Sequence, residues 1–307
     1  MKRGVMMFLP LLMPNTTIVG KWNKKTYRVM EKLGEGGIGA VYRVVDVLDG
    51  RNYALKLSED NLSLNREYEL LKKFEAIDTI VRVYEIDDMH VGDKIYYFLL
   101  MEYIPGITLN EYRKNRSISV AESIGIVIIL LKVMGEIHRR GYILGDTKLD
   151  NIMVNGEGKV TKIIDLGGVV KINAGIKEFT PAYDRASWQC GHRVAEESYD
   201  IFSAAMILTQ LLLAKFTFNP KVKSIHRVKE ELMNKKINGE LKESLIPILN
   251  GEKKGVKDFA NTLLTIYNKE RALEVMRKNK SRDKKINVYF FCSLSFFIYT
   301  VILILRK

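Results

Sequence analysis

Three polar side chains between residues 146 and 165 are spaced for the chemistry of phosphate groups. Asp146 is followed five positions later by Asn151, and Asp165 ends the apolar run VTKIID. The strand-like runs NIMV and KVTKII flank NGEG, a turn signal, so this backbone is predicted to form a tight hairpin that brings the three side chains together. Carboxylate and amide oxygens suit Mg²⁺, which is usually shared between a few protein oxygens and substrate phosphates. The stretch therefore indicates a magnesium–phosphate site.

A glycine-rich turn near the N-terminus predicts a second part of such a site. Gly34, Gly36 and Gly39 form G-x-G-x-x-G, a spacing that also occurs in dinucleotide-binding folds. In those folds the glycines open a helix, whereas here the β-branched run AVYRVVDV follows and predicts a strand hairpin lying over phosphates. Taken alone, the motif is also compatible with an ordinary glycine turn.

A charged residue interrupts the next apolar strand. Lys56 lies in YALKL, where a cation needs a partner or an anionic ligand. Glu67, in the helical stretch of residues 65–74, is the expected partner, because Glu69 would point to a different face of that helix. An exposed lysine on an edge strand is the alternative interpretation.

The elements that must position these groups fall into two parts of different character. Residues 27–104 are predicted to form mostly a sheet with one helix, and residues 94–103 are again strand-like. After Pro105-Gly106 the chain becomes helical, and residues 120–139 and 199–216 are expected to be core helices, because charges interrupt them too often for a membrane span. With 307 residues, 47% of them hydrophobic and 28% charged, the composition is that of a globular protein.

In order along residues 27–216, these motifs resemble the eukaryotic-type (Hanks-type) serine/threonine protein kinase family. The matching series is glycine loop, A-x-K, helix Glu, MEY, IHRRGYILGD, D-x-K-x-x-N, D-x-G, T-P-A-Y and D-x-x-S. The resemblance implies an α+β, two-lobed protein-kinase-like fold with a small β-rich N-lobe (23–104) and a larger helical C-lobe (105–276). It also implies ATP and Mg²⁺ as cofactors and the Ser/Thr hydroxyls of proteins as phosphate acceptors.

The family's roles can be carried to the matching positions. Asp146 would accept or orient the proton of the substrate hydroxyl, and Lys148 would neutralise charge on the γ-phosphate. Asn151 and Asp165 would hold the metal. The other residues expected to bind the nucleotide are Gly34, Gly36, Gly39, Val41, Ala54, Lys56, Glu67, Glu102, Ile104 and Met153.

Three further residues are expected to support this site. Thr180 would hold Asp146 and Lys148 from the activation segment, and Asp200 would anchor the backbone of the catalytic loop. His138 lies at the end of a predicted helix, where a structural role is favoured over a catalytic one.

Two departures from the family pattern concern control and substrate binding. Leu144-Gly145 stand where the family has His-Arg, so that arginine is not there to receive an activation-loop phosphate. We therefore expect activity that does not depend on phosphorylation of this loop. Arg185-Ala186-Ser187 replace A-P-E, which removes the usual ion pair with a later arginine and leaves the platform for the substrate without its expected support.

The C-terminal fifth of the chain predicts a single-pass transmembrane helix over residues 286–305 that anchors the protein. Residues 286–305 carry no charge over twenty positions, and a helix of that length spans about 30 Å, the thickness of the hydrocarbon core. The basic run 277–285 precedes it, which predicts a juxtamembrane linker and a kinase domain on the cytoplasmic face. A buried core helix is the alternative for residues 286–305.

The net charge of +13 is concentrated before that segment, since residues 221–285 hold 18 Lys and Arg against 9 Asp and Glu. An anionic membrane surface is the expected partner of this basic region. Nucleic acid is not expected, because no aromatic residues are interleaved with the cations next to residue 286.

The N-terminus and the cysteines are less informative. Residues 1–22 are predicted to be a poorly ordered leader, because the apolar stretch is short and broken by Pro10 and Pro14; a targeting signal is the alternative. Cys190 and Cys292 are too few and too distant for a disulfide framework, which fits a reducing compartment.

Two other functions remain open from the sequence alone. The Leu-Gly substitution, the altered A-P-E element and the predicted anchor are compatible with a small-molecule or lipid kinase of kinase-like fold. A nucleotide-binding pseudokinase scaffold is disfavoured, because the charged residues Lys56, Asp146 and Asp165 are all present.

Overall fold

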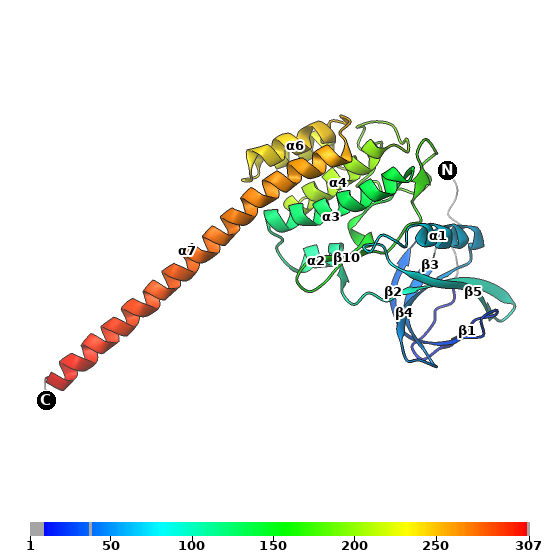
Figure 1. Cartoon of the computed structure of the whole chain (residues 1–307), viewed down its shortest axis with the longest axis horizontal. Coiled ribbons are helices and arrows are strands. Elements are labelled where there is room, and N and C mark those ends of the chain that lie inside the picture. The colour runs from blue at the N-terminus through cyan, green and yellow to red at the C-terminus, as the bar shows by residue number, and fades with distance from the viewer. Residues whose placement is uncertain (1–8, 37–38, 306–307) are drawn as a thin grey trace.

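The N-terminal lobe is a twisted antiparallel sheet with one helix against it (Figure 1). The computed structural model describes residues 9–36 and 39–305, a few of them by backbone alone. Within these residues the sheet has the strand order β1-β2-β3-β4-β6-β5. Its elements are β1 (Thr17–Val19), β2 (Thr26–Gly36), β3 (Gly39–Asp46), β4 (Asn52–Ser58), α1 (Asn61–Lys73), β5 (Val83–Val91) and β6 (Lys94–Glu102).

Helix α1 starts four residues before its predicted beginning at residue 65. The side chain of Asp60 accepts a hydrogen bond from the Ser63 backbone N–H, which caps one of the unpaired donors at the helix start. The buried side of α1 carries Leu64, Leu70 and Leu71, and Glu67 lies among them. A carboxylate is thus placed on the face that packs against the sheet.

The second half of the N-terminal leader is ordered, contrary to the prediction for residues 1–22. Strand β1 pairs with β2, and Leu12 and Ile18 are buried in a cluster on the second face of the sheet. The carboxylate of Asp87 accepts hydrogen bonds from the backbone N–H groups of Trp22 and Asn23, which fastens this segment to β5. Residues 1–8 lie outside the described residues.

The C-terminal lobe is built around two buried helices. Helix α3 (Val120–Arg139) has the predicted bounds and starts with a capping box of Ser119 and Glu122. Helix α4 (Glu197–Leu212) is almost wholly buried and packs against α3. The remaining elements are β7 (Ile107–Thr108), α2 (Leu109–Asn115), β8 (Tyr142–Ile143), η1 (Leu149–Asn151), β9 (Ile152–Val154), β10 (Val160–Ile163), β11 (Val170–Lys171), α4 (Glu197–Leu212), α5 (Ile225–Asn234), α6 (Gly239–Leu249) and α7 (Val256–Leu305).

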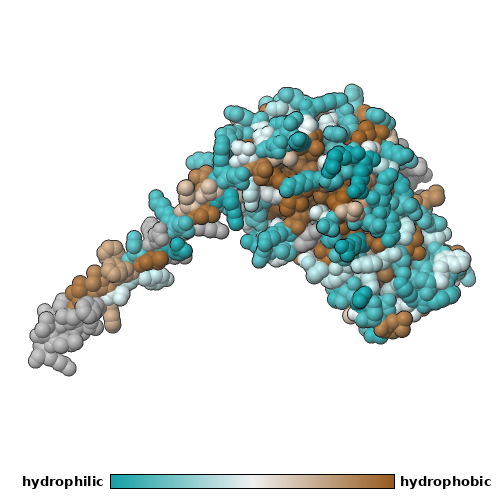
Figure 2. Space-filling view, in the orientation of Figure 1, coloured by the Kyte–Doolittle hydropathy of each residue, from teal (hydrophilic) through white to brown (hydrophobic). Residues whose placement is uncertain are grey.

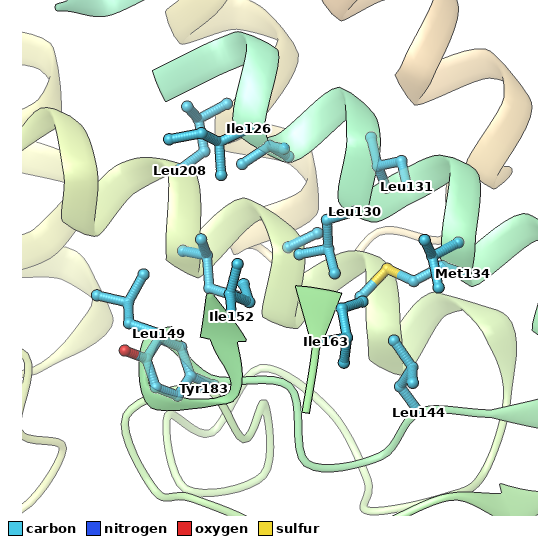
Figure 3. Packing of buried hydrophobic residues seen from close by; sticks show 14 of the residues in the cluster. Ile126, Leu130, Leu131, Met134, Leu144, Leu149, Ile152, Ile163, Tyr183 and Leu208 are labelled. Atoms are coloured by element: carbon cyan, nitrogen blue, oxygen red, sulfur yellow. The ribbon is translucent and has the colours of Figure 1, made fainter. Parts of the chain in front are cut away.

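The predicted hairpin between Asn151 and Asp165 is confirmed. Strands β9 and β10 pair antiparallel, with Ile152 opposite Ile163. Figure 3 shows Ile163 next to Leu130 and Met134 of α3 and Ile152 closer to Leu149, and all five belong to the main hydrophobic cluster. The hairpin is therefore fixed on the rigid helical core through its apolar side chains, while its polar ends face the lobe junction.

The C-terminal helix differs from the predicted linker followed by a separate span. Helix α7 is continuous from Val256 to Leu305, so residues 277–285 form a helical part of it. Its first part packs on α3, and the rest projects away from the body (Figure 1). Some side chains in residues 286–305 lie outside the described set. Among the residues that the structure describes, no helix is long and apolar enough to cross a membrane.

Candidate active site

A buried ion pair joins the sheet to α1. The Nζ atom of Lys56 lies 2.8 Å from Oε1 and 2.6 Å from Oε2 of Glu67, so the predicted pairing is confirmed. The same Nζ is 3.8 Å from Oδ1 of Asp165, in the other lobe. Burial lowers the pKa of Lys56, but the two carboxylates raise it more, and the net value is above the ordinary one. The lysine therefore stays a cation.

The catalytic loop places Asp146 between two donors. Lys148 donates from Nζ to one carboxylate oxygen at 2.9 Å, and the Thr180 hydroxyl donates to the other at 2.7 Å. Burial lowers the pKa of Lys148, but Asp146 outweighs this effect and raises it. The expected contact of Thr180 with Asp146 is thus present, and the structure adds the pairing of Lys148 with Asp146. An oriented carboxylate beside a cation is suited to accept a hydroxyl proton next to a phosphate.

Asn151 and Asp165 offer oxygen ligands that suit a hard cation. Asn151 donates from its amide nitrogen to the Asp146 carbonyl oxygen at 3.3 Å, which leaves its own amide oxygen available. Burial raises the pKa of Asp165, but Lys56, the Gly167 N–H and Lys148 outweigh it and hold the pKa below its usual range. No cluster of three or more His, Cys, Asp or Glu able to hold a metal occurs in the described residues. An amide and a carboxylate fit Mg²⁺ that takes its other ligands from phosphates.

Asp200 anchors the catalytic loop from α4, as predicted. Its carboxylate accepts the backbone N–H groups of Leu144 and Gly145 at 2.7 and 2.9 Å, and His138 Nε2 lies 2.8 Å away. Asp200 has no exposed surface. Because a buried carboxylate must be satisfied by donors, this arrangement fixes the loop that ends in Asp146. His138 belongs to this support and touches no reacting group.

A close backbone contact occupies the position where the family pattern has arginine. Gly145 has φ +77°, and a Cβ on it would lie 2.3 Å from the Gly168 carbonyl oxygen. A Cβ on Gly168 would lie 2.7 Å from the Cβ of Asp146. The catalytic loop and the segment after Asp165 are therefore held together by backbone packing that only glycine permits.

The glycine-rich turn that is expected to cover the nucleotide joins β2 and β3. Gly36 and Gly39 pair across the β2–β3 turn, which confirms the predicted hairpin. A Cβ on Gly34 or Gly36 would meet nothing within 4 Å, whereas one on Gly39 would lie 2.2 Å from the Leu57 carbonyl oxygen. Residues 37–38, at the tip, lie outside the described residues.

The apolar residues expected at the adenine come from both lobes. Val41 is on β3, Ala54 on β4 and Met153 on β9. Glu102 ends β6, and its carboxylate lies 3.1 Å from Lys162 Nζ. Ile104 follows in the irregular connection between the lobes. The adenine-binding role of these five residues stays a prediction.

The activation segment (residues 165–187) is braced by ion pairs that sequence reasoning missed. Asp184 is buried and accepts hydrogen bonds from Arg193 and from the Tyr199 hydroxyl. Arg185 is also buried and donates to Glu196 at 2.6 Å. The substrate platform therefore has support in place of the expected A-P-E pair. The sequence feature that could have indicated these ion pairs is the adjacent pair of charges Asp184-Arg185 at the start of the altered motif.

The same segment offers little for phosphorylation. Residues 166–179 contain no Ser, Thr or Tyr. The hydroxyls of Thr180, Tyr183 and Ser187 donate hydrogen bonds to Asp146, Gln210 and Asp184, respectively. This supports the expectation that activity does not depend on a phosphate in this loop.

Comparisons with known proteins agree with this geometry. A family model described as "Protein kinase domain" matches residues 27–279. The serine/threonine-protein kinase YabT of Bacillus subtilis (strain 168) is 35% identical over 264 residues, which cover 82% of this chain and 75% of that protein. Serine/threonine-protein kinase PrkC of the same organism is 24% identical over 66% of this chain and 32% of its own length. PknG of Mycolicibacterium smegmatis (strain ATCC 700084 / mc(2)155) is 29% identical, over 66% of this chain and 27% of its own length.

The first prediction tests the close contact at Gly145. Gly145→Ala introduces both an unfavourable positive φ and a clash with Gly168, so we expect at least about a tenfold loss of kcat, because a small displacement of catalytic groups is costly. Gly141→Ala is the control, since Gly141 has φ +80° but open space around its Cβ position. It should only destabilise the fold, by about 1–2 kcal/mol. Equal kinetic effects of the two variants would contradict the role of the contact.

The second prediction concerns the pH dependence of the platform. Lys253, with Arg185 and Ser198, lowers the pKa of Glu196 to about 2 against the opposing effect of burial. The stabilisation is therefore fully present above the ordinary glutamate pKa, 4.5, and is lost as the pH falls toward 2. In denaturant titrations, wild type should be more stable than Glu196→Gln at pH 7, and the difference should shrink below about pH 4.5. A difference that stays constant down to pH 3 would rule this out.

Proposed function

This chain belongs to the protein kinase family and is a serine/threonine protein kinase, and we propose that its phosphoryl transfer runs through Asp146, Lys148, Asn151 and Asp165. The observation that carries this assignment is the assembled network across the lobe junction. Lys56 is bonded to Glu67 and lies 3.8 Å from Asp165. Phosphoryl transfer depends mainly on such charge placement and alignment.

Each residue has a distinct task in this proposal. Asp146 receives the substrate hydroxyl and takes its proton as the hydroxyl oxygen bonds to the γ-phosphorus. The bond from that phosphorus to the β,γ-bridging oxygen breaks in the same transfer, and ADP leaves. Lys148 lies beside Asp146 and neutralises charge on the transferred group. Asn151 and Asp165 hold Mg²⁺, which when bound neutralises and orients the ATP phosphates. Lys56 binds the phosphates nearer the nucleoside.

Protein substrates are supported over small molecules by the activation segment. Its C-terminal part is held by the pairs Asp184–Arg193 and Arg185–Glu196, so an ordered surface lies beside Asp146. A scaffold without activity would not need Asp146, Lys148 and Thr180 to be mutually bonded.

The third prediction tests Asp146. Asp146→Asn keeps the shape of the side chain but removes its basicity, so transfer of radiolabelled γ-phosphate should fall by about 10²–10⁴-fold, the range for a lost general base. Asp49→Asn, in the turn before β4, is the control and should keep the wild-type rate. Unfolding of both variants at the wild-type temperature excludes a folding defect. Transfer that persists unchanged in Asp146→Asn would refute the assignment.

We also propose that the far part of α7 tethers the enzyme to a membrane. Support comes from the uncharged run 286–305 and from the basic run 277–285 before it. Large side chains such as Tyr289, Phe291 and Phe296 are at least 64% exposed on this part of α7, and Figure 2 shows it projecting from the body with brown, apolar groups on it. A lipid environment would cover these groups, and the basic run would face anionic headgroups on the cytoplasmic side.

The fourth prediction tests this tether in the full chain. Phe291→Arg with Ile298→Arg should move the protein from the membrane fraction to the soluble fraction, because each arginine costs about 2.5–3.5 kcal/mol at the centre of a membrane helix. Leu273→Arg with Met276→Arg is the matched control, since both residues are exposed on α7 before the basic run. Kinase activity should be retained in both. Membrane recovery of the first variant equal to wild type would contradict the tether.

A further inference from the structure

A groove rich in cations lies between α1 and the first part of the activation segment. Its volume is about 880 Å³, and it is open to solvent. Among the described residues that line it, one is acidic, Glu69. The cations that line it are Arg66, Lys72, Lys73, Lys171 and Lys177. They are here called the basic groove.

The two sides of the basic groove belong to different elements of the molecule. Arg66, Lys72 and Lys73 are on α1, whereas Lys171 and Lys177 are on the activation segment. Arg66 donates to the Val169 carbonyl oxygen, which ties the two sides together. Lys73 donates to the Tyr142 hydroxyl at 2.9 Å and lowers its pKa. Cations from both sides therefore face a common space, where like charges repel unless an anion lies between them.

The enzyme's own chain does not supply a phosphate for this space from the adjacent segment. Residues 166–179, which form one side of the groove, contain no Ser, Thr or Tyr. An anion that neutralises the basic groove must therefore come from outside the segment. We propose that the basic groove binds a compact anion with several phosphate groups, and that this anion activates the enzyme.

The shape of the groove favours a compact polyphosphate over other sources of phosphate. Its cations converge from two sides on one hollow, whereas a nucleic acid duplex is bound by cations spread along a surface that follows its backbone. A membrane surface is disfavoured by position, since the far end of α7 points away from α1 (Figure 1). A chain of a few phosphates places many negative charges in a small volume, which matches five convergent cations.

An anion in the basic groove is expected to raise kinase activity, because Arg66 is next to Glu67 in the chain. This expectation rests on the proposed function. Glu67, the next residue, is the partner of Lys56. An anion that bridges α1 and the activation segment removes the repulsion between them and stabilises the position of α1 in which this pair is formed. Because the ligand binds that position better, it shifts the population toward the assembled site.

The first arm of the test measures binding to the full-length, phosphatase-treated protein by calorimetry. The probe is inorganic tripolyphosphate, with excess Mg²⁺ and a saturating non-hydrolysable ATP analogue to block the nucleotide site. The triple variant Lys73→Gln, Lys171→Gln, Lys177→Gln should lose affinity for the probe by at least about tenfold. Binding to wild type should weaken with added salt. The control Lys221→Gln, Lys236→Gln, Lys257→Gln removes equal charge elsewhere and should bind like wild type. Equal affinities of the two triple variants would overturn the site.

The second arm measures kinase activity with and without tripolyphosphate. Wild type and the control should be activated. The groove variant lacks three of the repelling cations, so its basal rate should equal or exceed that of wild type, and tripolyphosphate should not raise it further. Binding without activation would overturn the regulatory part of the proposal. A DNA duplex or an anionic vesicle that displaced the probe at a lower phosphate concentration would overturn the assignment to a compact anion. The binding arm needs no catalysis, so a failure of the proposed function is seen separately, as absent transfer with intact binding.

Discussion

The buried pairing of Lys56 with Glu67 is the interaction on which the rest of the site depends. A lysine that is 8% exposed is stable as a cation only beside an anion. Here one carboxylate comes from α1 and another, at 3.8 Å, from Asp165 in the C-terminal lobe. The ammonium group therefore links β4, α1 and the segment that follows β10. Their relative positions depend on noncovalent contacts such as this one. Movement of α1 would leave buried charges unpaired, at a cost of about 3–5 kcal/mol, so the position of α1 determines whether the site is assembled.

The C-terminal half of the site is fixed in a different way. Asp200 is wholly buried and holds two consecutive backbone N–H groups of the catalytic loop. The hairpin with Asn151 at its start packs in the main hydrophobic cluster through Ile152 and Ile163 (Figure 3). These contacts are apolar packing or hydrogen bonds within the chain, and none of them depends on a bound ligand. The chemical groups of this lobe are thus preorganised, whereas the pairing of Lys56 with Glu67 depends on the placement of α1.

Features that depend on residues close together in the sequence could be predicted, and features that depend on distant residues could not. The bounds of α3 and the β9–β10 hairpin follow from periodicity and turn residues, and the pairing of Lys56 with Glu67 follows from the cost of a lone buried charge. The order of residues 9–22 could not be predicted, because Leu12 and Ile18 are buried by strands distant in sequence. The pairs of Asp184 and Arg185 also need the fold, since their partners Arg193 and Glu196 carry no spacing rule.

The departures from the family pattern share a physical meaning. Where an arginine would receive a regulatory phosphate, Gly145 instead allows a backbone contact with Gly168 that a side chain would block. Where A-P-E would stand, ion pairs of the buried residues Asp184 and Arg185 hold the platform. The first replacement removes an interaction that would depend on a phosphate, and the second supports the platform with a different set of ion pairs. In the regulation proposed here, an anion acts on the placement of α1 through the cluster of cations that α1 and the activation segment share. Cations gathered from two elements in one groove are the physical requirement for control by an anion.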